Sequence, residues 1–406
     1  MTSPSPAALT RSRPEGPPAP KRFRIRGIDL ARGVAMLGML AAHVGPSADD
    51  GTVVGSVMAL AQGRSSILFA TLAGVSLALM SGGRDIGASS RVAAQKIAVR
   101  AVLILALGTA LVALGTPVKV ILASYGVFFL LSLPFLRLAP RTLFILAGAT
   151  AVAGPIASML LRSSAVVTGA LAQIDRVDPI ALLSGEGVTR LLLTGVYPAI
   201  TWMPFLFVGL GLGRIGVERL RKVRLLLWGV GLMIVGYGGA FAARVLVPGA
   251  VPTWDASKKD FGSMIDKGEG AGMKPFGEGK PTGEVEWASL LSADQHTGAP
   301  FEIIGGIGAA LVVIAASIWL CARLPRLTWP IAAVGTMSLT VYTGHVLAIN
   351  AFGLSAMPGE PPWVLIAFAA VAAIFAVLWL RWFRRGPIES GMHAAVAWIG
   401  ERPGRR

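Results

Sequence analysis

The sequence consists of apolar runs near 20 residues long, separated by short polar segments. A helix rises about 1.5 Å per residue, so a run of about 20 residues crosses a hydrocarbon core of about 30 Å. Because lipid offers the backbone no hydrogen bonds, each run is expected to be helical. This pattern predicts an all-α, polytopic transmembrane helix bundle of about ten spans, at residues 27–46, 64–81, 96–115, 119–139, 142–161, 189–213, 223–246, 300–321, 329–352 and 362–382.

Basic residues follow every second predicted span, as expected for cytoplasmic loops. The loop 247–299 falls on the other side and is net acidic, with five lysines against eight Asp and Glu residues. This pattern predicts a multi-pass protein of the bacterial inner membrane, with both termini cytoplasmic. The basic residues that carry the prediction are Arg84, Arg91, Arg137, Arg141, Arg214, Arg219, Arg221, Lys222, Arg224, Arg323, Arg326, Arg381, Arg384 and Arg385.

The predicted organisation is one membrane domain between two cytoplasmic tails. Residues 1–21 are rich in Pro, Ser and Ala and are predicted to be disordered. Residues 22–385 form the membrane domain, with 247–299 as its extracytoplasmic loop, and residues 386–406 form the second tail. The net charge of +16 comes largely from the short loops, so no nucleic-acid partner is expected. Cys321 is the only cysteine, which excludes an intrachain disulfide, and no metal site is expected.

The first predicted span contains three ionisable residues, Asp29, Arg32 and His43. Such side chains are costly at helix depth, which makes them candidates for function. Asp29 and Arg32 are three residues apart and share a face of the helix. His43 lies eleven residues after Arg32, which returns it to nearly the same face, about 16 Å further along the axis. The alternative is an arginine that extends to the headgroups and a histidine that bonds to a neighbouring helix.

The ninth predicted span, 329–352, contains Tyr342 and His345, three residues apart on one face. His345 lies 16 residues after Trp329, and His43 lies 16 residues after Gly27. In straight helices both imidazoles would lie at the same depth, above the midplane on the outer side. The spacing therefore predicts that spans 1 and 9 pack together around one site. The alternative is two unrelated histidines that pack between helices.

Further polar and aromatic residues fall near the same outer level. Arg64 begins the second span, and Glu302 begins the eighth, shortly after His296. Tyr197 and Trp202 lie in the outer half of the sixth span, which Pro198 and Pro204 are expected to bend. These residues are candidates for binding a substrate that approaches from outside. Arg64 could equally contact headgroups, and Trp202 could belong to the interfacial aromatic belt.

Four segments together resemble a known family: IRGIDLARGVAMLGMLAAHV, GRSSILFATLAGVSLAL, TMSLTVYTGHVL and RRGPIES. In kind and order they resemble bacterial membrane proteins related to the heparan-alpha-glucosaminide N-acetyltransferase catalytic domain. That group overlaps with a YeiB-like family of uncharacterised membrane proteins. The resemblance covers residues 22 to 390. The spacing of Arg32 and His43 is also similar to the first-helix motif of membrane acyltransferases that act on surface sugars.

The resemblance implies a membrane acyltransferase. Cytoplasmic acyl-CoA, such as acetyl-CoA, would be the donor, and an envelope glycan or glycolipid would be the acceptor. By the first-helix motif His43 would be the catalytic histidine. On physical grounds it could act as a general base on the acceptor or as a transient acyl carrier, and Tyr342, His345 and backbone amides are candidates to stabilise the oxyanion. CoA phosphates would bind at the basic inner face, where Arg24, Arg26, Arg32 and Asp29 lie. One departure is clear: the lysosomal enzymes carry their reactive histidine in an outer segment after the first helix, and residues 46–63 here contain no histidine.

A second function remains open from the sequence. The same histidines and arginines could form a proton-coupled path in a transporter or flippase for a small polar or lipid-linked substrate. No matching broken helices are visible in two halves of the sequence, which disfavours this alternative. The absence of a GxxxxGK[ST] phosphate loop disfavours an ATP-driven pump. A purely structural membrane subunit is the third alternative. Membrane lipids are the expected surroundings, and homo-oligomerisation is left open.

Overall fold

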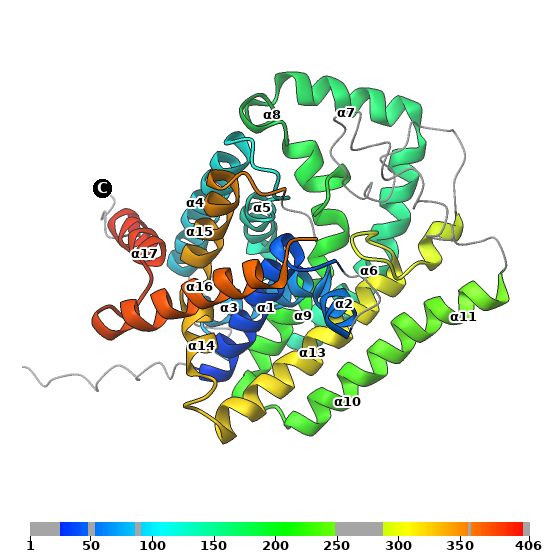
Figure 1. Ribbon diagram of the computed structural model, residues 1–406. Helices are drawn as coiled ribbons and strands as arrows, with labels where there is room; N and C mark the ends of the chain where they lie inside the picture. Colours follow the sequence, from blue (N-terminus) through cyan, green and yellow to red (C-terminus); the bar gives the residue numbers. More distant parts are fainter. Residues whose placement is uncertain (1–24, 48–52, 86–90, 248–286, 356–358, 401–406) are drawn as a thin grey trace, which may run out of the picture.

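The computed structural model describes residues 25–47, 53–85, 91–247, 287–355 and 359–400. Within these ranges the regular structure is entirely helical (Figure 1). Seven described helical segments are long and apolar enough to cross a membrane, or eight if the bent pair α14 (Trp329–Thr336) and α15 (Ser338–Ala351) is counted as one span. The prediction of a polytopic helical membrane protein is thus confirmed. The predicted tail 1–21 and the greater part of loop 247–299 lie outside the described residues.

All ten predicted spans overlap apolar helical segments, although not all of these are long enough to cross a membrane. The exceptions besides the bent pair are Leu122–Phe135, which includes α5 (Leu122–Ser132), and α9 (Ala199–Ile215). The predicted span 189–213 is interrupted, because the π-helix η2 (Arg190–Thr194) ends before Pro198, which precedes α9. The number ten and the orientation of the termini remain predictions.

Four helices form the centre of the bundle (Figure 1): α1 (Arg26–Val44), α3 (Arg64–Met80), α9 and α13 (Pro300–Arg323). Of an apolar 18-residue stretch of α1, 67% is buried inside the protein, against 11% of the corresponding stretch of α16 (Pro362–Trp382). A helix with apolar side chains on all sides and little internal burial is suited to contact with lipid. α16 and the segment Lys222–Leu246 therefore provide lipid-facing surface, and α1 forms part of the core.

Glycines allow the central helices to approach one another closely. A Cβ atom on Gly335 of α14 would lie 1.8 Å from the Asp29 carbonyl oxygen of α1, and one on Gly33 would lie 1.9 Å from the Ile331 carbonyl oxygen. Neither position can accept a side chain without movement of backbone. Small residues at such crossings permit the backbone contact that holds helices together in lipid. The first predicted span is thus fixed against the first half of the ninth.

The straight ninth span predicted for residues 329–352 is wrong. α14 and α15 meet at an angle of 83°, with Met337 between them. Counting residues from Trp329 therefore does not give the depth of His345. Since α14 packs on α1 and α15 contacts both α1 and α4 (Arg91–Ala113), the bend directs the second half of the segment across the bundle.

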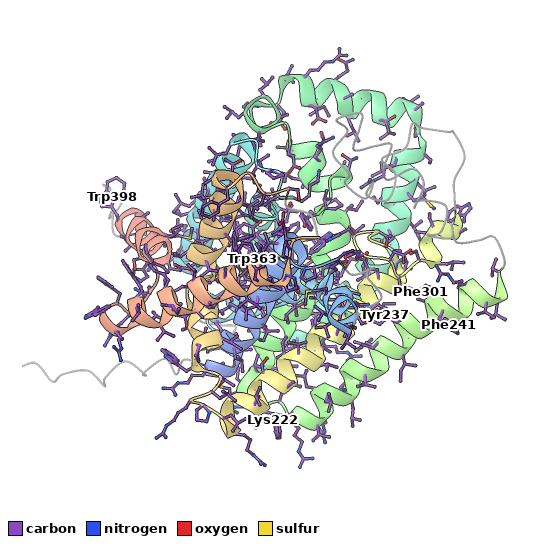
Figure 2. The ribbon with its side chains drawn as sticks, in the orientation of Figure 1. Lys222, Tyr237, Phe241, Phe301, Trp363 and Trp398 are labelled. Carbon is purple, nitrogen blue, oxygen red and sulfur yellow. The ribbon has the colours of Figure 1, made fainter. Side chains whose placement is uncertain are left out.

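The remaining helices surround this centre. α10 (Lys222–Met233), the π-helix η4 (Ile234–Gly238) and α11 (Gly239–Leu246) run along one edge against α13. Figure 2 labels Tyr237 and Phe301 at this junction, where the Tyr237 ring lies against Gly305. α2 (Val53–Ala61) precedes α3, while α6 (Pro140–Ser163), α7 (Ala165–Val177) and α8 (Pro179–Ser184) follow one another in the chain. The predicted tail 386–406 contains α17 (Pro387–Gly400), which packs against α4 and α15.

Candidate active site

The structure brings His43 of α1 and His345 of α15 into direct contact. Nδ1 of His43 lies 3.2 Å from Nε2 of His345. The two rings are stacked, with centroids 5.4 Å apart and planes inclined by 10°. His345 is only 5% exposed, while His43 is partly buried. The predicted proximity of these two helices around the histidines is therefore observed, although the bend in the ninth span means that the depth count did not establish it.

The contact between His43 and His345 fits two tautomeric arrangements, because either ring nitrogen can be the donor. Nδ1 of His345 is buried and has no hydrogen-bond partner among the described residues. In one arrangement the proton of His345 is on Nδ1, which leaves Nε2 as an acceptor. Nδ1 of His43 then donates to Nε2 of His345, and Nε2 of His43 retains its lone pair. In that arrangement His43 is a neutral base, which is the arrangement that an acid–base role requires.

Tyr342 borders the histidine pair. Its ring meets His345 edge to face, with centroids 5.0 Å apart and planes at 82°. Its hydroxyl oxygen accepts a hydrogen bond of 3.1 Å from the backbone N–H of Ile121. Ile121 directly precedes α5, so this bond holds the Tyr342 hydroxyl oxygen against the start of that helix. The hydroxyl proton of Tyr342 remains available as a donor.

Arg32 and Asp29 form an ion pair on the same face of α1, with Nη1 and Oδ1 2.9 Å apart. Nη2 of Arg32 also donates to the Ser76 hydroxyl of α3 at 3.1 Å. The Arg32 side chain keeps 22% of its surface exposed. Arg100 of α4, which the sequence analysis did not single out, is close enough to Arg32 to interact electrostatically. Arg26 is exposed at the start of α1, and Arg24 lies outside the described residues.

Four of the five residues predicted to bind substrate form a second cluster. The Trp202 and His296 rings are stacked with centroids 6.4 Å apart, and Tyr197 meets them edge to face at 5.0 Å and 5.4 Å. Glu302 holds the loop before α13, because its carboxylate accepts from the His296 and Gly298 N–H groups at 2.6 Å each. It also accepts from the Thr297 hydroxyl at 3.0 Å.

His296 has the only positive φ, 62°, among the described non-glycine residues. A strained backbone held by three hydrogen bonds often marks a functional position. Its buried Nδ1 has no hydrogen-bond partner among the described residues. Burial lowers the pKa of His296 to about 4, so the imidazole is neutral at pH 7. His296 is close enough to His43 for an electrostatic interaction between the two clusters.

Arg64, the fifth residue predicted to bind substrate, has different partners. Its Nε donates to the Tyr237 hydroxyl at 2.9 Å, and its guanidinium lies 4.8 Å from the centre of that ring. Nη1 donates to the Ala59 carbonyl at 3.0 Å, at the end of α2. These contacts join α2, α3 and η4, so Arg64 has a clear structural role.

The sequence analysis missed Arg162 of α6, which is 9% exposed and lines a small cavity with Trp202, His296 and Thr297. Its Nε donates to the Ser158 hydroxyl at 3.2 Å and its Nη2 to the Leu193 carbonyl at 3.0 Å. Because it follows an apolar run directly, its sequence context is that of an arginine at a membrane boundary. Within the described ranges no cluster of three or more His, Cys, Asp or Glu residues is arranged to hold a metal ion.

Two family models match the chain. Residues 24–236, which include Arg32 and His43, match the catalytic domain of heparan-alpha-glucosaminide N-acetyltransferase. Residues 284–399, which include Tyr342 and His345, match a protein family of unknown function, DUF418. No curated protein gives a significant match. The histidine pair thus joins one residue from each matched region. Since the first match covers more than half of the chain, the protein belongs to the membrane acyltransferase-like family of the heparan-alpha-glucosaminide N-acetyltransferase catalytic domain.

Proposed function

We propose that the protein moves an acyl group, acetyl in the first instance, from cytoplasmic acyl-CoA to an extracytoplasmic sugar or glycolipid. The observation that carries this proposal is the contact between His43 and His345, in which Nε2 of His43 is free to act as a base when its Nδ1 donates to His345. Family membership supplies the reaction class, and a bacterial inner membrane is the proposed location. The donor, the acceptor and the membrane remain parts of the proposal.

In the proposed reaction Nε2 of His43 takes the proton of the acceptor hydroxyl or amino group as that group attacks the thioester carbonyl. The new C–O or C–N bond forms, the C–S bond breaks, and the CoA thiolate recovers the proton from His43. His345 stabilises the transient imidazolium because its Nε2 accepts from Nδ1–H of His43. The hydroxyl proton of Tyr342 is the proposed donor to the oxyanion.

The length of α1 supports a donor that enters from the opposite side. The helix is continuous from Arg26 to Val44. Arg32 and His43 are therefore separated by about 16 Å along the axis, comparable with an extended pantetheine arm, on the order of 15–20 Å. We place the CoA phosphates near Arg32 and Arg100, because guanidinium groups pair well with phosphate. Trp202, Tyr197 and His296 form the proposed acceptor side, where aromatic rings suit the apolar face of a sugar.

A transporter or flippase is the second candidate function. The break between α14 and α15, together with the π-helices η2 and η4, favours it, because discontinuous helices often line transport pathways. In that case the histidine pair would carry protons during transport rather than activate an acceptor. The two functions differ in whether a covalent acyl product accumulates.

The test is to incubate purified protein with acetyl-labelled CoA and an envelope extract, and to follow label into sugar or lipid fractions. Wild-type protein should transfer label, and His43→Ala should lose activity by roughly 10²–10⁴-fold, the usual contribution of a general base. Asn350→Ala is the matched control, since Asn350 is exposed on α15. Absence of transfer by wild-type protein, with uptake by proteoliposomes that depends on His43, would favour the transporter.

A further inference from the structure

The start of α15 requires hydrogen-bond acceptors from outside its own segment. The first N–H groups of a helix have no partner within it, and the break at Met337 places such groups inside the bundle. No side chain of the preceding residue caps them. Unsatisfied N–H groups in a low-dielectric interior would destabilise the bend by a few kcal/mol. The acceptors come from α17, about 50 residues later in the chain.

Glu389 of α17 supplies these acceptors. Its Oε1 accepts from the N–H groups of Leu339 at 2.8 Å and Thr340 at 3.1 Å. Its Oε2 accepts from the Thr340 hydroxyl at 2.5 Å. The Ile388 N–H donates in turn to that hydroxyl at 3.2 Å. The carboxylate thus caps the helix as an N-cap residue does, but from a distant segment, and its negative charge suits the positive end of α15.

The residues around Glu389 fit this contact. A Cβ atom on Gly386 would lie 2.2 Å from Oε2 of Glu389 and 2.7 Å from Oγ1 of Thr340, so a side chain there would displace the carboxylate from this contact. Pro387 begins α17, a position where the missing N–H costs nothing. The RRGPIES segment therefore has a clear physical role, which is to hold the carboxylate against the start of α15.

The contact lies close to the histidine pair. His345 is six residues after Leu339, so the two are separated by about 9 Å along α15. At that distance a tilt of about 10° would move the imidazole by roughly 1.5 Å, and displacements near 1 Å can reduce a rate about 10²-fold. The separation of 3.2 Å between His345 and His43 therefore depends on the direction of α15.

We infer that Glu389 is a positioning residue that fixes α15, and through it His345, against His43. Its effect on rate rests on the proposed transferase function, but its effect on geometry does not. The hydrogen bonds of the carboxylate reach Leu339 and Thr340 of α15 and neither histidine, so α15 is the proposed route to the pair.

The geometric test uses thiol cross-linking. In a Cys321→Ser background, His43→Cys and His345→Cys replace the pair, and the rate of disulfide formation under mild oxidant reports their proximity. Adding Glu389→Ala should slow cross-linking at least tenfold, and Glu389→Gln less, because the amide oxygen can still accept from both N–H groups. Ser390→Ala, in the same turn of α17 and exposed, should leave the rate unchanged. An unchanged rate in Glu389→Ala would overturn the inference.

The kinetic test uses the wild-type histidines. Glu389→Ala should lower kcat for acyl transfer by about 10–100-fold, as expected for a displaced group at the reacting centre. It should not raise KM for acyl-CoA, because loss of a negative charge near Arg100 does not weaken phosphate binding. A parallel rise in KM with unchanged kcat would contradict the inference. If cross-linking depends on Glu389 but wild-type protein transfers no acyl group, the proposed function fails and the positioning role stands.

Discussion

At the residue scale, the candidate site consists of a histidine pair and a neighbouring group of aromatic and acidic side chains. His43, His345 and Tyr342 lie in contact, and Trp202, Tyr197, His296 and Glu302 form a cluster close to them. These residues were visible in the sequence because polar side chains in apolar runs are costly and therefore conspicuous. Arg162 and Glu389 were not, because an arginine after a span and a glutamate after a basic loop resemble ordinary boundary residues.

The two histidines should contribute unequally. His43 carries the proposed base, while His345 orients it and stabilises its charge. His345→Ala should therefore reduce acyl transfer by about 10–100-fold, less than the roughly 10²–10⁴-fold loss expected for His43→Ala. Turnover of labelled acyl-CoA by each variant measures the difference. Equal losses would assign the two imidazoles equivalent roles, and a larger loss in His345→Ala would reverse them.

Arg32 should affect the donor. Arg32→Ala removes both the Asp29 ion pair and the contact with Ser76, and should raise KM for acyl-CoA about tenfold or more. Arg32→Lys should recover only part, because a lysine lacks the planar fork that pairs with phosphate. Binding of acyl-CoA to detergent-solubilised protein, measured by calorimetry, checks the result. Unchanged affinity in Arg32→Ala would place the donor site elsewhere.

His296 should make stability depend on pH. Its pKa is about 4 in the folded protein, below the ordinary value near 6.5. Above pH 6.5 both states are neutral, whereas between pH 6.5 and 4 only the unfolded state binds the proton, so the free energy of unfolding falls as pH falls. Burial raises the pKa of Glu302 to about 7, which acts in the opposite direction in both proteins. The thermal midpoint should therefore fall more, between pH 7.5 and 4.5, in the wild-type protein than in His296→Gln. An equal drop in the variant would contradict the assignment.

At the element scale, sequence periodicity located the helices but did not reveal the break in the ninth span. Residues 329–352 carry no charged residue and no interior proline, since Pro330 lies in the first turn, where it is tolerated. The bend at Met337 is flanked by the close contact of Gly335 with α1 and by the Glu389 cap from α17. Both are tertiary contacts, so no local pattern could predict them. The same applies to Glu302, which holds the His296 loop.

The crossing of α1 and α14 gives a prediction about stability. Gly335→Ala places a methyl group against the Asp29 carbonyl, at 1.8 Å before relaxation, and should destabilise the protein by about 1–3 kcal/mol. Gly344→Ala is the matched control, since nothing lies within 4 Å of a Cβ atom there. It should be neutral or stabilise by about 0.5–1 kcal/mol, because alanine favours helix. Thermal unfolding in one detergent compares them, and equal midpoints would contradict the close crossing.

At the scale of the whole molecule, hydropathy predicted the fold class because lipid permits few alternatives to helices. It overstated the regularity of the spans. Leu122–Phe135 and Ala199–Ile215 are shorter than a full crossing, and the predicted ninth span is bent. Such segments lie in the protein interior, where other helices supply the contacts that lipid cannot. The length of an apolar run therefore identifies a peripheral span such as α16 reliably. It does not identify buried segments such as Leu122–Phe135 and Ala199–Ile215, which are shorter than a full crossing.

The side of the membrane on which each loop lies is the last prediction. The alternation of basic loops places Arg84, Arg224 and Arg385 in the cytoplasm and residues 255–290 outside. Reporter fusions after the three arginines should be active only with cytoplasmic reporters, and a fusion within 255–290 only with external ones. The test is decisive because Leu122–Phe135 and Ala199–Ile215 are short. If one of them does not cross the membrane, every later loop lies on the opposite side from the predicted one. If neither crosses, the loops after the second return to their predicted sides. A cytoplasmic signal at 255–290 would exclude the ten-span topology. It would also place the loop with His296 on the donor side, and the proposed transfer across the membrane would lose its acceptor site.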